Sequence, residues 1–127
     1  MLPSSSRKIL AVMQDLFFTV KVNESAKRAG LAVDFVKSEL DALDRAADSP
    51  ALIILDLNFA AVDHLKLIRE LKSHAATKRI PLLGYLSHIQ GELKQQAQEA
   101  GCDTVLAKSA FSQNLLQILK RHAEPHT

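Results

Sequence analysis

One short stretch, residues 50–58, constrains the fold of this chain more than any other. Within it, five apolar residues at positions 51–55 run straight into Asp56. An uninterrupted apolar run of this length, bounded by Ser49 and Pro50, predicts a strand that is buried on both faces. Such strands lie in the middle of parallel sheets, and ligands collect outside their carboxyl ends. We therefore expect Asp56 at the mouth of a parallel sheet, where it either does chemistry or only ends a strand.

Four further apolar runs alternate with stretches of helical periodicity. We expect strands at residues 8–13, 31–36, 80–86 and 104–107, and helices at 15–29, 38–47, 64–74, 89–100 and from Ser109 or Ser112 onward. Repeated β–α alternation specifies a parallel sheet with right-handed crossovers and helices on both faces. The chain is therefore predicted to be a flavodoxin-like α/β domain of three layers (α/β/α), with a doubly wound five-stranded sheet in the order 2-1-3-4-5.

Local signals at the helix ends support these boundaries. Ser38 and Asp63 are candidate N-caps, and Gly30 and Gly101 are candidate helix terminators. The periodicity also predicts which side chains of the first three helices face the core. These are Phe18, Val22, Ser25, Ala26 and Ala29 in the first helix, Leu40, Leu43 and Ala47 in the second, and Leu65, Ile68 and Leu71 in the third.

Composition excludes several classes of protein. A chain of 127 residues that is 47% hydrophobic forms one domain, expected at residues 8–122 between a loose arm (1–7) and a tail (123–127). A formal charge of +2 is too small to argue for nucleic-acid binding. No apolar window is long enough for a membrane span or signal peptide, and Cys102 is the single cysteine, so we expect a cytoplasmic protein.

The segment after the central apolar run carries a family resemblance. Residues 56–63 read Asp-Leu-Asn-Phe-Ala-Ala-Val-Asp. This segment resembles the Asp-x-x-Met-Pro-x-x-Asp-Gly loop of the receiver domain of two-component response regulators. Asp56, Asn58 and Asp63 match that loop and Phe59 stands for the Met, whereas Ala and His64 replace the Pro and Gly. Residues 100–108 resemble the family's Ala-Gly-Ala turn and the Lys that ends its fifth strand, here Lys108.

The resemblance implies a function for the end of the sheet. In receivers the Asp at the position of Asp56 accepts a phosphoryl group from a sensor histidine kinase or a phosphotransfer protein. The resemblance then implies Lys108 as the charge partner of the phosphoryl group or of Asp56 itself, and Ser87 as the switch hydroxyl. Counting from Pro81 as the family does gives Leu86, however, so Ser87 lies one place late. Ser87 as an ordinary turn or capping residue, and Lys108 as a surface lysine, are the alternatives.

The resemblance also implies Mg²⁺, which neutralises charge during phosphoryl transfer and prefers oxygen ligands. Its expected ligands are Asp56, the backbone carbonyl of Asn58 and an acidic pair after the first strand. Met13 and Gln14 occupy the positions of that pair, with Asp15 one place later. Gln14 offers a neutral oxygen, and Asp15 is either a weak ligand or simply a helix N-cap. Magnesium binding is therefore expected to be weakened.

Two functions remain open at this stage, and neither is that of an enzyme. The first is a stand-alone receiver phosphorylated on Asp56. The second is a pseudo-receiver that binds partners without phosphorylation, through a surface formed by residues 89–120. Both imply a separate effector protein, because no DNA-binding output domain follows in this chain, and a weak homodimer is a further option. A flavodoxin-like redox enzyme suits the fold, but no glycine-rich phosphate loop is present.

Overall fold

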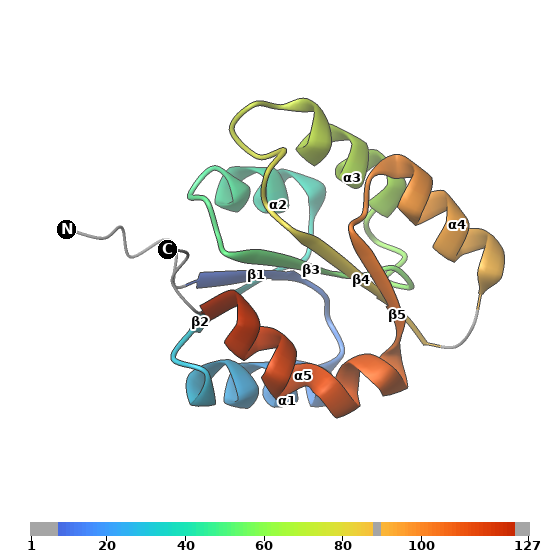
Figure 1. Ribbon diagram of the computed structural model, residues 1–127. Helices are drawn as coiled ribbons and strands as arrows, with labels where there is room; N and C mark the ends of the chain where they lie inside the picture. Colours follow the sequence, from blue (N-terminus) through green and yellow to red (C-terminus); the bar gives the residue numbers. More distant parts are fainter. Residues whose placement is uncertain (1–7, 88–89, 124–127) are drawn as a thin grey trace.

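The computed structural model describes residues 8–87 and 90–123 (Figure 1). The predicted arm (1–7) and most of the predicted tail (124–127) lie outside the described residues. Strands and helices alternate along the chain. The strands are β1 (Lys8–Val12), β2 (Ala32–Val36), β3 (Leu52–Asp56), β4 (Leu82–Leu86) and β5 (Thr104–Ala107). The helices are α1 (Leu16–Arg28), α2 (Glu39–Ala46), α3 (His64–Ser73), α4 (Gly91–Ala100) and α5 (Lys108–Ala123).

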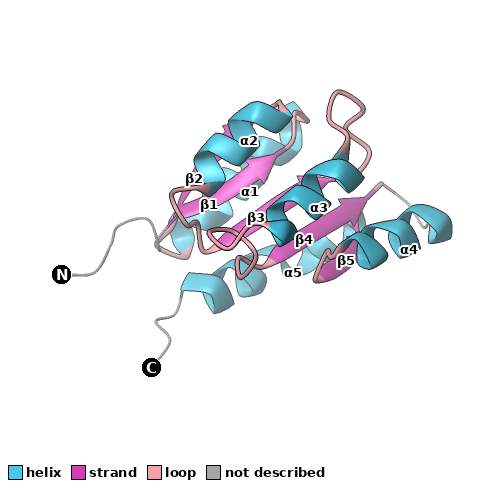
Figure 2. Ribbon diagram, turned by 90° about the horizontal axis from the view of Figure 1, so that it is seen from above, coloured by secondary structure: helices cyan, strands magenta, loops and turns pink. Residues whose placement is uncertain are grey.

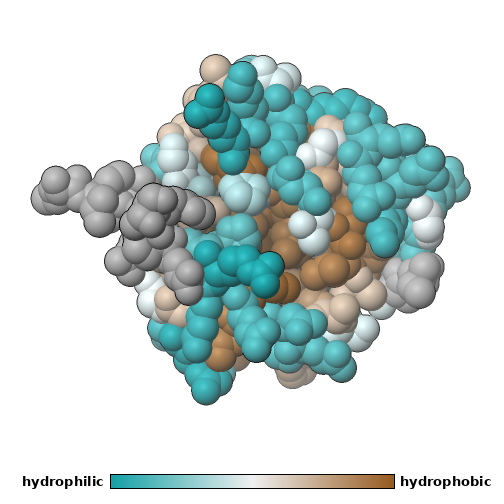
Figure 3. Space-filling view, in the orientation of Figure 1, coloured by the Kyte–Doolittle hydropathy of each residue, from teal (hydrophilic) through white to brown (hydrophobic). Residues whose placement is uncertain are grey.

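The five strands form one parallel sheet in the order β2-β1-β3-β4-β5, which confirms the predicted topology. Helices α1 and α5 cover one face, and α2, α3 and α4 cover the other (Figures 1 and 2). The sheet therefore separates two hydrophobic cores, one on each face. In the view of Figure 3, hydrophobic residues gather at the centre between the two helix layers, and hydrophilic residues surround them.

Strand β3 lies at the centre of this sheet, as its apolar run predicts. Leu52, Ile53, Ile54 and Leu55 are at most 1% exposed. Successive side chains point to opposite faces, so Leu52 and Ile54 enter the α1–α5 core while Ile53 and Leu55 enter the other. By the same alternation, Asp56 lies on the α1–α5 side at the carboxyl edge of the sheet.

Capping residues begin and end the helices largely where the sequence predicts. The side chains of Asp15, Ser38 and Asp63 accept hydrogen bonds from the backbone N–H groups at the third position of α1, α2 and α3. Gly101 ends α4 with φ 120°, a conformation that favours glycine because it has no Cβ. None of the helices in the described part of the chain is long and apolar enough to cross a membrane.

Three local predictions need correction. Leu40 of α2 is 80% exposed, and the helix instead packs through the buried Ala42 and Ala46, which are one turn apart. Helix α5 begins at Lys108 rather than at a serine, directly after β5. Helix α4 begins at Gly91, and residue 89, where the sequence predicts its start, lies outside the described residues.

Candidate functional site

The carboxyl ends of the central strands meet around Asp56, the last residue of β3. Its side chain is half-buried, and its Oδ1 accepts a hydrogen bond from the backbone N–H of Asn58 at 3.0 Å. The Asp56 carbonyl accepts a second bond from the N–H of Phe59, also at 3.0 Å. Both bonds turn the chain sharply after β3. The loop thereby holds the carboxylate at the edge of the sheet, where ligands of such sheets bind.

Asn58 connects this loop to the loop that follows β4. Its Oδ1 accepts a hydrogen bond from the backbone N–H of Ser87 at 2.6 Å, and its Nδ2 donates to Gln90 Oε1 at 2.7 Å. Leu57 reinforces the contact by packing on Gly84, where an added Cβ would lie 2.8 Å from the Leu57 side chain. The Asn58 side chain therefore fixes two loops relative to each other. The sequence assigned a role only to its backbone carbonyl.

Lys108 reaches a different carboxylate from the one that the resemblance suggests. Its Nζ lies 2.6 Å from Asp15 Oδ2, and each side chain is 34% exposed. The ammonium also lies 4.9 Å from the centroid of the Phe18 ring, which favours a cation–π interaction. None of the ion pairs among residues 8–87 and 90–123 involves Asp56. In this structure Lys108 thus neutralises Asp15, and the pairing with Asp56 is not seen.

Asp15 consequently has two partners. One carboxylate oxygen caps α1 by accepting from the Phe18 N–H at 3.1 Å, and the other binds Lys108. The hydrogen bond from Lys108, followed by that from Phe18, lowers the pKa of the Asp15 carboxyl below its usual value. The alternative prediction that Asp15 is the N-cap of a helix is confirmed. Both oxygens are already engaged, so the carboxylate is a poor candidate for a direct metal ligand.

Met13 and Tyr85 fill the space beside Asp56 on the α1–α5 face. Tyr85 is in register with Asp56, and Met13 follows Val12, which is in register with Leu55. Both side chains are at most 1% exposed, and the tyrosine hydroxyl lies 4.0 Å from the methionine sulfur. Burial, together with the charge of Asp56, raises the pKa of the Tyr85 hydroxyl, which therefore stays protonated. A thioether therefore stands at one position of the expected acidic pair, and a neutral phenol packs beside it.

Tyr85 packs in an aromatic cluster with two phenylalanine rings. Its ring stacks on Phe111 of α5 at 5.4 Å and meets Phe18 of α1 edge-on at 5.2 Å. Sequence reasoning missed Tyr85 as a site residue. The available signal was its place in β4, one residue before the position at which the family carries its switch hydroxyl. That position, Leu86, is buried in the opposite core, while Ser87 is exposed and binds Asn58 through its backbone N–H.

The residues present are a poor fit for a divalent cation. A hard cation such as Mg²⁺ prefers several oxygen ligands, and the thioether of the fully buried Met13 offers none. Gln14 lines a groove between α1 and β2, and Asp15 is held by Lys108. Across the described ranges, no group of three or more His, Cys, Asp or Glu side chains could hold a metal. Only Asp56 and the Asn58 carbonyl remain from the predicted set.

His64, which replaces the glycine of the family loop, is buried below this loop. It is 5% exposed, and its Nε2 lies 3.2 Å from the carbonyl oxygen of Phe59, so the neutral ring donates there. Its Nδ1 is buried and has no hydrogen-bond partner within the described part of the chain. Burial lowers the pKa of His64, although Asp56, Asp63 and Glu39 act in the opposite direction. The ring stabilises the loop as a packed neutral group.

Comparison with known proteins gives structural matches alone. No protein-family model matches this chain, and no curated protein sequence matches it. The phosphorylated cyanobacterial phytochrome response regulator RcpA is 26% identical, with a TM-score of 0.74 over 91% of this chain and 89% of that chain. A response regulator from Hahella chejuensis is 17% identical, with a TM-score of 0.83 over 94% of this chain and 99% of that chain. This chain has the receiver fold.

A third match bears on the metal question. The receiver domain of a sensor histidine kinase from Pseudomonas aeruginosa, described with a magnesium ion in its active-site cleft, is 22% identical and has a TM-score of 0.77. The match covers 92% of this chain and 97% of that chain. The similarity to these proteins is one of fold. Within the receiver fold, the chemistry at Asp56 depends on this chain's own residues.

Proposed function

We propose that this receiver-like chain acts in two-component signalling as an interaction module that works without phosphorylation of Asp56. The observation that carries the proposal is the ion pair of Lys108 with Asp15, at 2.6 Å. Transfer of a phosphoryl group to a carboxylate brings two anions together, and positive charge must lie at the acceptor to lower the barrier. In this chain Lys108, the cation that the resemblance places at the acceptor, pairs with Asp15 instead.

The side chains beside Asp56 support the same conclusion. Met13 and Tyr85 are buried and uncharged, and Tyr85 belongs to the aromatic cluster, so they add no positive charge to balance a second anion. Gln14 contributes at most a neutral oxygen. We infer that Mg²⁺ binds this edge of the sheet far more weakly than a complete carboxylate set would bind it. Asp56 then acts as a structural residue that organises the loop through Asn58.

The alternative function is that of a phosphoacceptor receiver, and one observation favours it. Asp56 is half-buried at the mouth of the sheet, and its loop is held in place by Asn58. In that case Ser87 supplies the switch hydroxyl, and Lys108 exchanges Asp15 for the phosphorylated Asp56. A sensor histidine kinase or a phosphotransfer protein would then be the donor.

Several consequences are common to both functions. The chain acts as a cytoplasmic, non-enzymatic module, and a separate effector protein receives the signal. Upstream partners are histidine kinases or phosphotransfer proteins, which the module binds with or without phosphoryl transfer. The predicted contact surface at residues 89–120 stays a prediction. Helix α4 offers few apolar side chains to such a surface. Most of its residues are polar, and its Ala97 is buried.

Intact-mass measurement tests the proposal directly. The chain is incubated with acetyl phosphate and millimolar Mg²⁺, and a receiver domain known to be phosphorylated serves as positive control. We expect the mass to show no added phosphoryl group. We also expect that Asp56→Asn captures the same partners as the wild type from a cell extract that contains two-component signalling proteins. A phosphoryl gain that Asp56→Asn abolishes, together with capture that depends on it, would overturn the proposal in favour of the alternative.

A further inference from the structure

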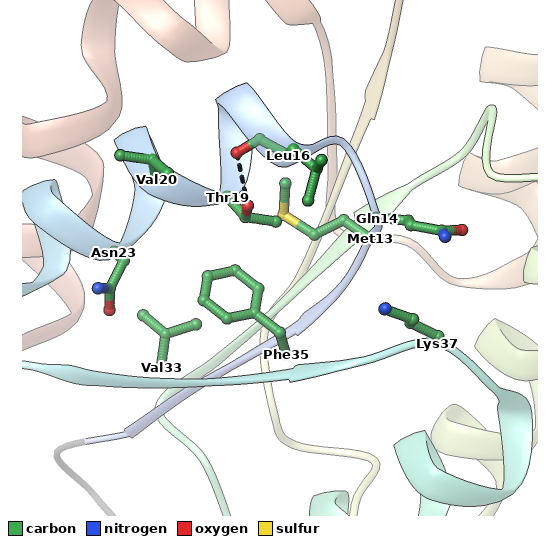
Figure 4. Close-up of a pocket in the computed structure, with 9 residues that line it drawn as sticks. All are labelled: Met13, Gln14, Leu16, Thr19, Val20, Asn23, Val33, Phe35 and Lys37. Carbon is green, nitrogen blue, oxygen red and sulfur yellow. Dashed lines mark hydrogen bonds between the residues drawn. The ribbon is translucent and has the colours of Figure 1, made fainter.

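A groove lies between α1 and the edge strand β2, and Met13 and Gln14, which follow β1, also line it (Figure 4). Its volume is about 440 Å³. Leu16 and Val20 of α1 form one wall, and Val33 and Phe35 of β2 form the opposite side. The buried Met13 closes its floor, and Lys37 lies at one end. The lining thus combines these five apolar residues with three neutral polar ones, Gln14, Thr19 and Asn23, and has a cation at one end.

The α1 wall is unusually exposed for apolar residues. Leu16 is 79% exposed and Val20 is 58% exposed, and these residues lie one helical turn apart on the same side of α1. Phe17, beside them, is 91% exposed. Hydrophobic residues that cluster on a surface in this way mark interaction sites more often than isolated ones do. The wall therefore offers apolar area that an incoming chain could bury.

Strand β2 offers hydrogen bonds at the same place. Among the described residues it pairs with β1 alone, so within this part of the chain its other side is a free edge. The Val36 carbonyl accepts from the Met13 N–H at 3.3 Å and hence faces β1. Because the N–H and C=O of one strand residue point to the same side and alternate along the strand, those of Val33 and Phe35 face outward. The two residues whose side chains line the groove thus also carry the available backbone groups.

Charge at the groove is one-sided. Lys37 is the one charged residue that lines it, and no ion pair is found for it among the described residues. Asp34 alternates with Val33 and Phe35 and so belongs to the other face, where it pairs with Lys8 and Arg45. Lys37 continues the spacing of Val33 and Phe35 by two residues. A complementary chain would present two apolar side chains and then an acidic one at the same spacing.

We propose that the free edge of β2 binds an extended segment of a partner protein, which adds a strand to the sheet. Its backbone pairs with Val33 and Phe35, two alternate apolar side chains enter the groove against Leu16 and Val20, and an acidic side chain pairs with Lys37. This inference names a docking surface for the proposed interaction module and so rests on that proposed function. It places the surface at α1 and β2 rather than at residues 89–120.

A second copy of the chain fits this edge less well. When two β2 strands pair antiparallel through their outward residues, the residue opposite Lys37 is Ala29, Leu31 or Val33, depending on the register. None of these is acidic. The nearest carboxylate of β2, Asp34, lies on the other face and is already paired. Charge complementarity therefore favours a different protein over a β2–β2 dimer.

Peptide binding tests the inference. The probe is fluorescein-labelled Thr-Val-Thr-Val-Thr-Glu-Thr, used together with its reversed sequence because strand direction is open. We expect saturable anisotropy changes with one of the two, and slower hydrogen exchange of the Val33 and Phe35 amides in the complex. Leu16→Glu should weaken binding about tenfold or more by placing a charge in the apolar contact. Lys37→Glu should weaken it about fivefold, as expected for an exposed ion pair, and a peptide with Lys in place of Glu should restore it.

Matched controls separate this result from loss of folding and from the chemistry at Asp56. Lys27→Glu makes the same charge change on an exposed α1 residue outside the groove and should leave binding within about twofold. Asp56→Asn should leave peptide binding unchanged, because Asp56 does not line the groove. Intact-mass measurement then tests the proposed function, and peptide binding tests the docking surface, so the two can fail separately. Absence of saturable binding by either peptide, or slowed exchange elsewhere than at β2, would overturn the inference. Sedimentation that shows a dimer disrupted by Lys37→Glu would also overturn it, in favour of a second copy.

Discussion

Lys108 Nζ lies 2.6 Å from Asp15 Oδ2, which joins the first residue of α5 to the N-cap of α1 across the end of the sheet. Helices α1 and α5 are neighbours on the same face, so the ion pair adds to their packing. It also removes the one lysine near the sheet edge that the resemblance assigns to Asp56. The relationship between these two residues is what most distinguishes the electrostatics of this site from that expected of a phosphoacceptor.

This ion pair predicts a contribution to stability that depends on pH. Hydrogen bonding to Lys108 lowers the pKa of Asp15 below the ordinary value of an aspartate. The stabilisation is therefore complete above about pH 4 and is lost as pH falls through the lower pKa of the folded state. Asn at position 15 retains an N-cap, so Asp15→Asn isolates the charge. We expect it to cost about 0.5–1 kcal/mol of unfolding free energy near pH 6, and less near pH 2.5.

Urea denaturation of four proteins checks this prediction. The wild type, Asp15→Asn, Lys108→Gln and the double variant form a cycle that isolates the coupling between the two side chains. A coupling free energy that is indistinguishable from zero at pH 6 would contradict it.

Restoring the acidic pair should restore metal binding. The double substitution Met13→Asp with Gln14→Asp returns two carboxylates to the edge beside Asp56, and oxygen ligands are what Mg²⁺ requires. We expect this variant to bind Mg²⁺ at least about tenfold more tightly than the wild type, because added carboxylates strengthen such sites. Calorimetric titration measures the affinity. Adding Asp56→Asn to the variant should remove most of the gain in Mg²⁺ affinity. If the wild type binds Mg²⁺ as tightly as the variant, the missing carboxylates do not weaken the site and the prediction is wrong.

Asn58 should control the coupling of the two loops around Asp56. Asn58→Ala removes the bonds to the Ser87 N–H and to Gln90, at 2.6 and 2.7 Å. Each such bond contributes about 0.5–1.5 kcal/mol. We expect the Ser87 amide to exchange with solvent about tenfold faster, while amides in the middle of β3 keep their protection. Gln90→Ala, which removes only the second bond, is the matched control. Equal effects of the two variants at Ser87 would contradict this assignment.

His64 should make the fold less stable at mildly acidic pH. Burial lowers its pKa below the ordinary value of a histidine, about 6.5, so at mildly acidic pH the unfolded chain binds a proton that the folded chain does not. Stability is then unaffected above about pH 7 and falls below pH 6.5, by at most about 1.4 kcal/mol per pH unit until the folded-state pKa is reached. His64→Gln keeps a donor for the Phe59 carbonyl but does not titrate. The unfolding free energies of His64→Gln and the wild type are compared at pH 7.5 and 5.5, and the wild type should lose more stability between these values. An equal loss in both proteins would exclude a contribution from His64.

Much of the fold follows from local sequence signals. The apolar run before Asp56 predicts a central buried strand, and Asp15, Ser38 and Asp63 begin their helices as N-caps do in general. Helix α2 is the exception. Periodicity gave inward positions to Leu40 and Ala47, whereas the short Ala42 and Ala46 face the sheet, because Ala side chains let a helix lie close to it. Sequence alone does not reveal such a choice between two possible faces.

For this protein, the sequence by itself determined the parallel sheet, its strand order and the position of Asp56 at its carboxyl edge. Strand burial, β–α alternation and turn chemistry are local properties, and few sheet topologies satisfy all of them together. Only the tertiary structure decided that Lys108 pairs with Asp15 and that Tyr85 and Met13 pack beside Asp56. It also decided that Leu16 and Val20 are exposed beside the edge strand β2. These contacts join residues far apart in sequence, and which of several chemically suitable partners a side chain meets depends on packing across the whole domain.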